Sequence, residues 1–200
     1  MTGNMRLILA SQSRARQDML RAAGLAFDAA PAHLDEDGIT ARILMQNGDA
    51  ADVARMLACE KARHVSAQYP DALVIGSDQV LSHRGALLNK AKDSEEALQK
   101  LRRLNGDMHE LTAAVAAAYK GDVIWAHHES ARLFMREMDD AHIKSYLGRA
   151  GDAVTSSVGA YALEGAGAWL FEKVEGDFFT ILGMPLLPLL SFLRQKGFGP

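Results

Sequence analysis

Short apolar runs alternate with longer amphipathic stretches through the first part of the chain. Residues 6–10, 27–30 and 72–75 have the length and apolar character of strands, whereas residues 16–23 and 51–68 have helical spacing. Strands that alternate with helices are typical of α/β proteins. The pattern therefore predicts an α/β sheet protein.

Two pairs of strands in the middle of the chain are expected to form hairpins. One pair flanks His83-Arg84-Gly85, and the other flanks Lys120-Gly121-Asp122, both of which are turn sequences. The first hairpin would bring Lys90 back toward Asp78. The expected strands are residues 79–82 and 86–89 for the first hairpin, and 111–119 and 123–134 for the second.

Three further helices are expected at residues 94–104, 138–147 and 185–194. Asp93 or Ser94 would cap the first of them. The last helix begins at Pro185, ends near Gly197 and is rich in leucine. Burial against the sheet is favoured for this helix over a membrane or partner surface.

Composition and charge narrow the class of protein. The 200 residues are 48% hydrophobic and 24% charged, which suits a single domain over 1–200, or two closely packed lobes, with a sizeable core. A net charge of -3 gives no basic field for nucleic acid. The single cysteine, Cys59, cannot form an internal disulfide and is expected to be buried and inert. No signal peptide or membrane span is recognisable, so a cytoplasmic location is expected.

Two apolar runs are each followed directly by a polar segment whose side chains could bind a ligand or take part in catalysis. Residues 73–75 precede Gly76-Ser77-Asp78-Gln79, interpreted as a turn that delivers a carboxylate and lets phosphates approach the backbone. Residues 7–10 precede the segment 11–16, whose hydroxyls, arginines and helix start favour phosphate oxygens. The plain alternatives are a solvated turn aspartate and a helix cap beside a surface arginine.

Together these segments resemble the Maf family of nucleoside triphosphate pyrophosphatases. The matching segments are Leu9-Ala10-Ser11-Gln12-Ser13 with Arg16, Leu34-Asp35-Glu36, Glu60-Lys61-Ala62, Gly76-Ser77-Asp78, Lys90, Gly106-Asp107-Met108-His109-Glu110-Leu111-Thr112, Gly159-Ala160-Tyr161, Glu175-Gly176-Asp177 and Gly183-Met184-Pro185-Leu186. The ordered set is hard to obtain by chance, although each segment alone is weak.

The resemblance implies a fold and an activity. The expected fold is a mixed sheet flanked by helices, of the inosine-triphosphatase type, with two lobes around a central cleft. The expected reaction is hydrolysis of a nucleoside triphosphate to its monophosphate and pyrophosphate with Mg²⁺ or Mn²⁺, in nucleotide-pool house-cleaning, by a homodimer. A different class of function is a regulator of septum formation that binds nucleotides without turnover.

The resemblance also implies roles for individual residues. Asp78 would be the main catalytic carboxylate and, with Glu36, would hold the metal. The cationic residues Arg16, Lys61 and Lys90 would bind the phosphate chain together with Ser11. Glu60 would join this site or form an ion pair on the helix surface. At Lys90 the usual Gly-Lys-Pro of the family is replaced by Asn89-Lys90-Ala91, so the rigidity of this loop is in question.

Three positions bear on the nucleobase. The family's uridine/thymidine type has Arg, Thr and Gln at the places of Ala15, Gln79 and Glu164, and its 7-methyl-GTP type has Trp, Gln and Glu. This chain matches the second type at two of the three places. Glu164 would accept from a guanine and Gln79 would donate to its O6, which predicts a guanine-type substrate with a UTP/dTTP type as the alternative. Ala15 cannot stack on a methylated base.

Several other polar and aromatic residues are assigned structural roles. The aromatic residues Trp169 and Tyr161 are expected in the core rather than at the base. His109 and Thr112 are expected to support the scaffold, and the pair His127-His128 is assigned no site because neighbours on a strand face opposite ways.

Overall fold

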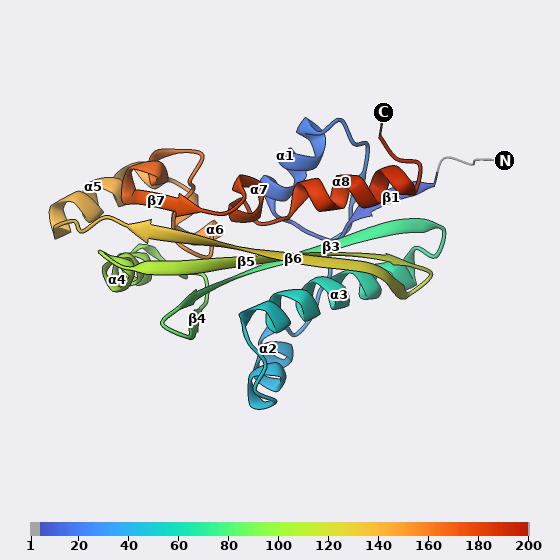
Figure 1. Ribbon diagram of the computed structural model, residues 1–200, viewed down its shortest axis with the longest axis horizontal. Coiled ribbons are helices and arrows are strands. Elements are labelled where there is room, and N and C mark those ends of the chain that lie inside the picture. Colours follow the sequence, from blue (N-terminus) through green and yellow to red (C-terminus); the bar gives the residue numbers. More distant parts are fainter. Residues whose placement is uncertain (1–4, 200) are drawn as a thin grey trace.

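A mixed seven-stranded sheet forms the centre of the molecule (Figure 1). The computed structural model describes residues 5–199. Six strands lie in the order β2-β1-β3-β5-β6-β7, and β4 pairs with β3. Strand β1 is parallel to both of its neighbours, and every other pair is antiparallel. The strands are β1 (Arg6–Leu9), β2 (Asp28–Ala29), β3 (Ala72–His83), β4 (Ala86–Leu88), β5 (Met108–Tyr119), β6 (Asp122–Met135) and β7 (Phe171–Glu175).

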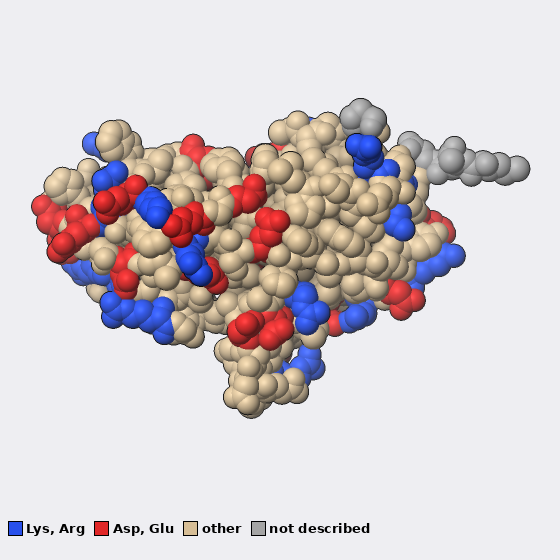
Figure 2. All heavy atoms as spheres, in the orientation of Figure 1, with Lys and Arg blue, Asp and Glu red and all other residues tan. Residues whose placement is uncertain are grey.

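Helices cover both faces of this sheet, which confirms the predicted fold class. Helices α1 (Arg14–Ala22) and α8 (Leu186–Gln195) lie on one face, α3 (Ala50–Gln68) lies on the other, and α2 (Glu36–Met45) projects beyond α3 (Figures 1 and 2). The remaining helical elements are α4 (Ser94–Leu104), α5 (Asp140–Ala150), α6 (Ala153–Ser156), the 3₁₀ helix η1 (Ala166–Leu170) and α7 (Phe178–Ile181). Figure 2 shows acidic and basic side chains interspersed on the face in view.

The alternation of side chains along β3 divides the core between the two faces. Leu73 and Ile75 pack with α1 and α8, whereas Val74 lies in a separate cluster with Val65 of α3. A third large cluster lies at the other end of the sheet, where Leu81 packs with residues of α4 and α5. The core is therefore distributed over two ends of the sheet, and the long strands β3, β5 and β6 connect them (Figure 1).

The predicted turn at Gly76-Ser77-Asp78 is wrong, because β3 continues through these residues to His83 while paired with β5. A Cβ atom at Gly76 would lie 2.2 Å from the Ala58 carbonyl oxygen and 2.5 Å from the Ala62 nitrogen. The hydroxyl of Ser77 is fully buried and lies 2.8 Å from the Ala114 carbonyl oxygen. Gly76 therefore serves close packing of α3 on β3 rather than an approach of phosphates to the backbone.

One edge of β3 is open over a short stretch. Strand β1 pairs with β3 as far as Ile75, and β4 pairs with it only from Leu81. Residues 76–80 therefore have β5 on one side and no strand on the other. Since β1 leads into α1 at this gap, the carboxyl end of a parallel strand faces it, where ligands commonly bind in α/β proteins.

Most of the other predicted elements are confirmed. Both hairpins close with two-residue turns, Arg84-Gly85 and Lys120-Gly121, in which every residue has positive φ, as the favoured hairpin turns require. Asp93 caps α4, and α8 buries its apolar face. Helix α1 begins two residues earlier than expected because Ser13 caps it. Helix α5 likewise spans 140–150 rather than 138–147, because Asp139 caps it.

The pattern missed α2, α6, η1, β7 and α7. Helix α2 fully buries only Ile43, so its sequence carries no apolar stripe. The elements α6, η1 and α7 have four or five residues, too few for helical periodicity to show. Strand β7 lies at the sheet edge with mostly exposed residues.

The structure bears on two expectations, one about membrane-spanning segments and one about Cys59. In the described part of the chain no helix is both long and apolar enough to cross a membrane. Cys59 is partly buried rather than fully buried, and burial raises the pKa of its thiol. The raised pKa keeps the thiol protonated at neutral pH and makes it a poor nucleophile.

We expect Gly76→Ala to lower the free energy of unfolding by about 3 kcal/mol, since the new methyl group would meet the backbone of α3. Gly148→Ala is the control, because its Cβ would meet nothing within 4 Å and it lies inside α5. Gly148→Ala should raise the free energy of unfolding by about 0.5–1 kcal/mol. Urea denaturation of the two variants measures the difference, and equal effects would contradict the packing role of Gly76.

Candidate active site

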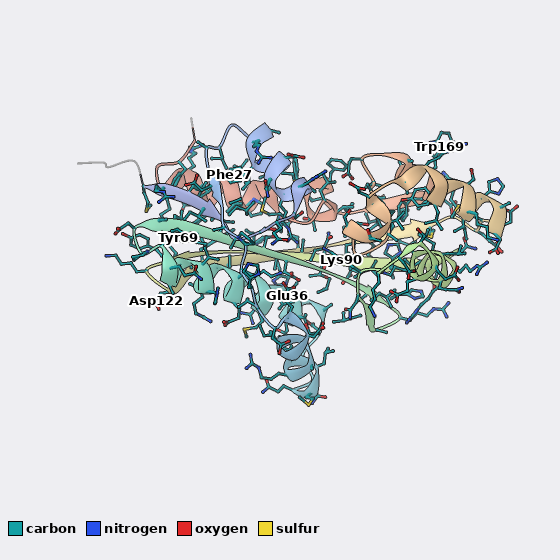
Figure 3. The ribbon with its side chains drawn as sticks, turned by 180° about the vertical axis from the view of Figure 1, so that it is seen from behind. Phe27, Glu36, Tyr69, Lys90, Asp122 and Trp169 are labelled. Carbon is teal, nitrogen blue, oxygen red and sulfur yellow. The ribbon has the colours of Figure 1, made fainter. Side chains whose placement is uncertain are left out.

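A cleft of about 1040 Å³ opens at the gap in the edge of β3. Its walls come from the segment 10–16, from residues around Glu36, from the end of β4 with Lys90, and from residues 152–164 and 181–183. Asp78, Gln79 and Val80 of β3 also line it. Glu36 and Lys90 lie near the middle of the molecule on the side seen in Figure 3.

A lysine held between two carboxylates forms the centre of this cleft. The Lys61 ammonium nitrogen lies 2.7 Å from Asp78 Oδ1 and 2.9 Å from Glu36 Oε1. Lys61 and Asp78 come from elements that pack together at Gly76, and both side chains are about 10% exposed. Glu36 lies in the first turn of α2, and its side chain is about half exposed. The structure therefore brings together three residues that the sequence places far apart.

Burial and charge act in opposite directions on Asp78. Burial disfavours the ionised carboxylate and raises its pKa, while the neighbouring cations Lys61 and Arg16 oppose this rise and Glu36 adds to it. The net result is a pKa above the ordinary value for aspartate. A carboxylate of this kind accepts a proton more readily than an exposed one.

The segment 11–16, predicted from the sequence to bind phosphate oxygens, lines the cleft. Ser11 Oγ accepts a hydrogen bond from the Ser13 backbone N–H at 3.2 Å and one from Arg16 Nη1 at 3.4 Å. Arg16 Nε donates to the Gly183 carbonyl oxygen at 2.9 Å. Burial lowers the pKa of Arg16, and Asp78 and Glu36 counter this effect. The alternative of a capped helix holds only for Ser13, because Arg16 points into the cleft rather than to the surface.

Gln79 faces the cleft, and its side-chain amide nitrogen is already hydrogen-bonded to the backbone. Its Nε2 donates to the Thr180 and Ile181 carbonyl oxygens, both at 2.9 Å. An amide has two N–H groups, so this arrangement leaves only Oε1 for a ligand. The expectation that Gln79 donates to a base oxygen is therefore wrong: the side chain offers an acceptor.

Helix α7 supplies the carbonyls that hold these groups, and the sequence analysis did not assign it this role. Its N-cap Asp177 accepts from the Thr180 backbone N–H at 2.8 Å, and the buried Thr180 hydroxyl donates to Glu129 Oε2 at 2.9 Å. The segments 175–177 and 183–186 match motifs of the family, and they contribute the Asp177 side-chain cap and the Gly183 carbonyl oxygen. No side-chain pattern indicates the role of the carbonyl groups.

Lys90, Ala15 and Glu164 also line the cleft, as the hairpin and the base-recognition expectations require. Burial lowers the pKa of Lys90, with a further contribution from Arg16, and Asp78 raises it. The hairpin therefore brings Lys90 into the electrostatic reach of Asp78. Glu164 is exposed and lies in the wall formed by residues 152–164.

Glu60 does not join these residues. It forms an ion pair with Arg63 one turn along α3 and does not line the cleft. Successive helix residues point about 100° apart, so Glu60 turns away when Lys61 points inward. The surface ion pair considered from the sequence is therefore present, with Arg63 as the partner.

Tyr161 and Trp169 were both expected in the core, but only Tyr161 is buried there. Tyr161 is buried as expected, and its hydroxyl lies 2.5 Å from His109 Nε2. Burial lowers the pKa of His109 to about 4, so this histidine is neutral and structural. The prediction that Trp169 lies in the core is wrong: Trp169 is 84% exposed and lies at the end of the molecule (Figure 3). Thr112 lies 2.7 Å from the Ser130 hydroxyl and also serves the scaffold.

These features define an α/β protein with a cleft lined by cations and carboxylates. The chain belongs to the Maf family: residues 6–196 match the family model described as Maf-like protein. A nucleoside triphosphate pyrophosphatase from Bradyrhizobium diazoefficiens is 50% identical over 194 residues, which cover 97% of this chain and 95% of that protein. A 7-methyl-GTP pyrophosphatase from Rhizobium etli is 46% identical, with 96% of each chain covered.

Solved structures give a weaker likeness. A nucleoside-triphosphatase / dITP/XTP pyrophosphatase from Mycobacterium abscessus aligns with a TM-score of 0.41 at 11% identity, over 96% of this chain and 95% of that chain. This likeness is too low to bear on the site.

We expect Asp78→Asn to leave the free energy of unfolding at pH 7 equal or higher. The raised pKa means that the folded state binds the proton more tightly than the unfolded state, so ionised Asp78 costs stability. This cost is absent below the ordinary aspartate pKa and grows as pH rises toward the folded pKa. The advantage of the variant should follow the same course in urea denaturation at several pH values.

Asp107→Asn is the matched control and should have the opposite sign. Hydrogen bonds, first from His83, lower the pKa of Asp107 to about 2. Asp107 therefore contributes stability that is present above the ordinary pKa and is lost as pH falls toward 2. A loss of stability at pH 7 in Asp78→Asn comparable to that in Asp107→Asn would contradict our account of Asp78.

Proposed function

We propose that this protein hydrolyses a nucleoside triphosphate between its α and β phosphates, releasing the monophosphate and pyrophosphate. The observation that carries the proposal is the meeting of Lys61, Arg16 and Lys90 with the raised-pKa carboxylate of Asp78 in one cleft. Membership of the Maf family and the printed names of the similar proteins support the same reaction.

Each charged group has a distinct part in this reaction. Arg16 presents a planar fork whose Nε is fixed on the Gly183 carbonyl, so its orientation is set before a phosphate binds. Lys61 opposes the effect of burial on the pKa of Asp78 and lies where phosphate oxygens would approach. Asp78 would orient the attacking water and accept its proton. Water is the nucleophile, and pyrophosphate leaves with the electron pair of the cleaved P–O bond.

The donor set also fits a divalent metal ion. Asp78 and Glu36 present carboxylate oxygens on either side of one ammonium group, which marks this point as favourable for positive charge. Hard divalent cations prefer oxygen ligands and commonly take the rest from substrate phosphates and water. No group of three or more His, Cys, Asp or Glu side chains within residues 5–199 could hold a metal alone. A bound Mg²⁺ or Mn²⁺ would neutralise phosphate charge.

Two acceptors on the cleft wall favour a guanine base. Gln79 can offer only Oε1, and Glu164 offers a carboxylate. Guanine presents adjacent N1–H and N2 amino donors, whereas uracil and thymine present a single N3–H between two acceptors. A pyrimidine would place its own acceptors against these acceptors and satisfy fewer of them, so the pyrimidines should bind less well.

Recognition of a 7-methyl group has less support from the site. Ala15 offers no ring for stacking on a cationic base, and Tyr161 is the only Phe, Tyr or Trp side chain from the described residues that lines the cleft. Its hydroxyl is engaged by His109. A cation–π contact of about 0.5–2 kcal/mol is therefore a smaller source of preference here than the two acceptors.

The decisive experiment measures pyrophosphate release from GTP, 7-methyl-GTP, ITP, UTP and dTTP with and without Mg²⁺ or Mn²⁺. We expect turnover that is lost with EDTA and restored by the metal. Asp78→Asn should reduce kcat by about 10²–10⁴-fold, the usual contribution of a general base. Asp107→Asn, which lies outside the cleft, should retain activity. Nucleotide binding with no turnover of any triphosphate would favour the regulator of septum formation instead.

A second prediction concerns the base. Glu164→Gln replaces an acceptor-only group with one that can also donate, so the ratio of kcat/KM for GTP over UTP should fall by about 10-fold. Glu172→Gln, outside the cleft, is the control and should leave this ratio unchanged. Faster hydrolysis of UTP or dTTP than of every purine triphosphate by the unmodified protein would contradict the guanine assignment.

A further inference from the structure

Lys100 on α4 links two walls of the cleft from behind. Its ammonium group donates to the Val158 carbonyl oxygen at 2.8 Å and also to the Asn89 carbonyl oxygen. Asn89 and Val158 both line the cleft, whereas Lys100 does not. Lys100 therefore reaches the two walls through their backbone without approaching a ligand itself.

The environment of Lys100 is unusual for a helix-surface lysine. Burial lowers its pKa to about 8, and Glu96, one turn earlier on the same helix, counters this effect. No carboxylate from the described residues forms a salt bridge with it. Its contacts from the other two segments are neutral carbonyls. Charge-assisted hydrogen bonds, rather than an ion pair, offset the cost of removing water from the Lys100 ammonium group.

The loop held by Lys100 carries a phosphate-binding candidate. Asn89 immediately precedes Lys90, and Ala91 follows in place of a proline that would stiffen the loop. Lys90 is repelled by Arg16 and Lys61 and attracted by Asp78 and Glu36 across the cleft. Its position among these charges depends on the backbone of the loop that carries it. The hydrogen bond from Lys100 restrains the residue next to Lys90.

We propose that Lys100 is a positioning residue that fixes the Lys90 loop to the wall formed by residues 152–164. Through this link, the group that binds phosphate and the wall that carries Glu164 keep a constant separation. The inference rests on the proposed function, because it assigns Lys90 to a phosphate of the substrate.

The test is a double-mutant cycle on Lys90 and Lys100. Lys100→Met should raise KM for GTP and the inhibition constant of inorganic pyrophosphate by about 10-fold, as loss of an orienting partner commonly does. In a Lys90→Met background the same change should have little further effect, because Lys100 acts through Lys90. Lys100→Arg keeps the charge and the donors and should restore much of the loss.

Lys144→Met on α5 is the matched control, since Lys144 is exposed and does not line the cleft. The inference is overturned if Lys100→Met behaves like Lys144→Met, or if it causes the same loss with and without Lys90. If Lys100→Met fails to fold, Lys100→Gln carries the cycle instead. Absence of turnover by the unmodified protein would overturn the proposed function. In that case, titration calorimetry with pyrophosphate measures the double-mutant cycle through binding affinity alone. Equal losses of affinity with and without Lys90 would still overturn the role of Lys100.

Discussion

The close contact between helix α3 and strand β3 at Gly76 determines the geometry of the site. Because Gly76 has no side chain, the backbone of α3 at Ala58 and Ala62 can lie directly against the strand. Asp78 lies two residues further along the same face, and Lys61 lies beside Ala62. A larger residue at Gly76 would push the helix away and separate the ammonium from the carboxylate. The 2.7 Å contact between Lys61 and Asp78 therefore depends on a position that touches no ligand.

A second constraint acts from the segment that follows β7. The Gly183 carbonyl oxygen accepts from Arg16 Nε at 2.9 Å and lies 3.1 Å from the Ser77 hydroxyl. The carbonyls at the end of α7 hold Gln79 in the same way. Backbone carbonyls fix the cation, the strand and the amide relative to one another, so the orientation of these groups depends on α7 remaining folded. Its N-cap and the bond from Thr180 to Glu129 supply that stability.

The sequence predicted the features that depend on local patterns. Hairpin turns and the C-terminal helix follow from spacing and turn residues, and Asp78 lines the cleft. The predicted turn before Asp78 is wrong, because small residues mark both turns and close packing. Only the position of α3 distinguishes the two cases. The acceptor role of Gln79 likewise depends on carbonyls about a hundred residues away, which no local pattern indicates.

The buried charges of the cleft are a cost to the stability of the fold. Arg16, Lys61 and Lys90 gather in a chain whose net charge is -3, and burial lowers the pKa of Arg16 and Lys90. Asp78 is also disfavoured as an anion by its burial. Apolar residues would pack in this place at lower cost. Asp78 and Glu36 offset part of the repulsion among these cations, and a bound polyphosphate would offset more of it.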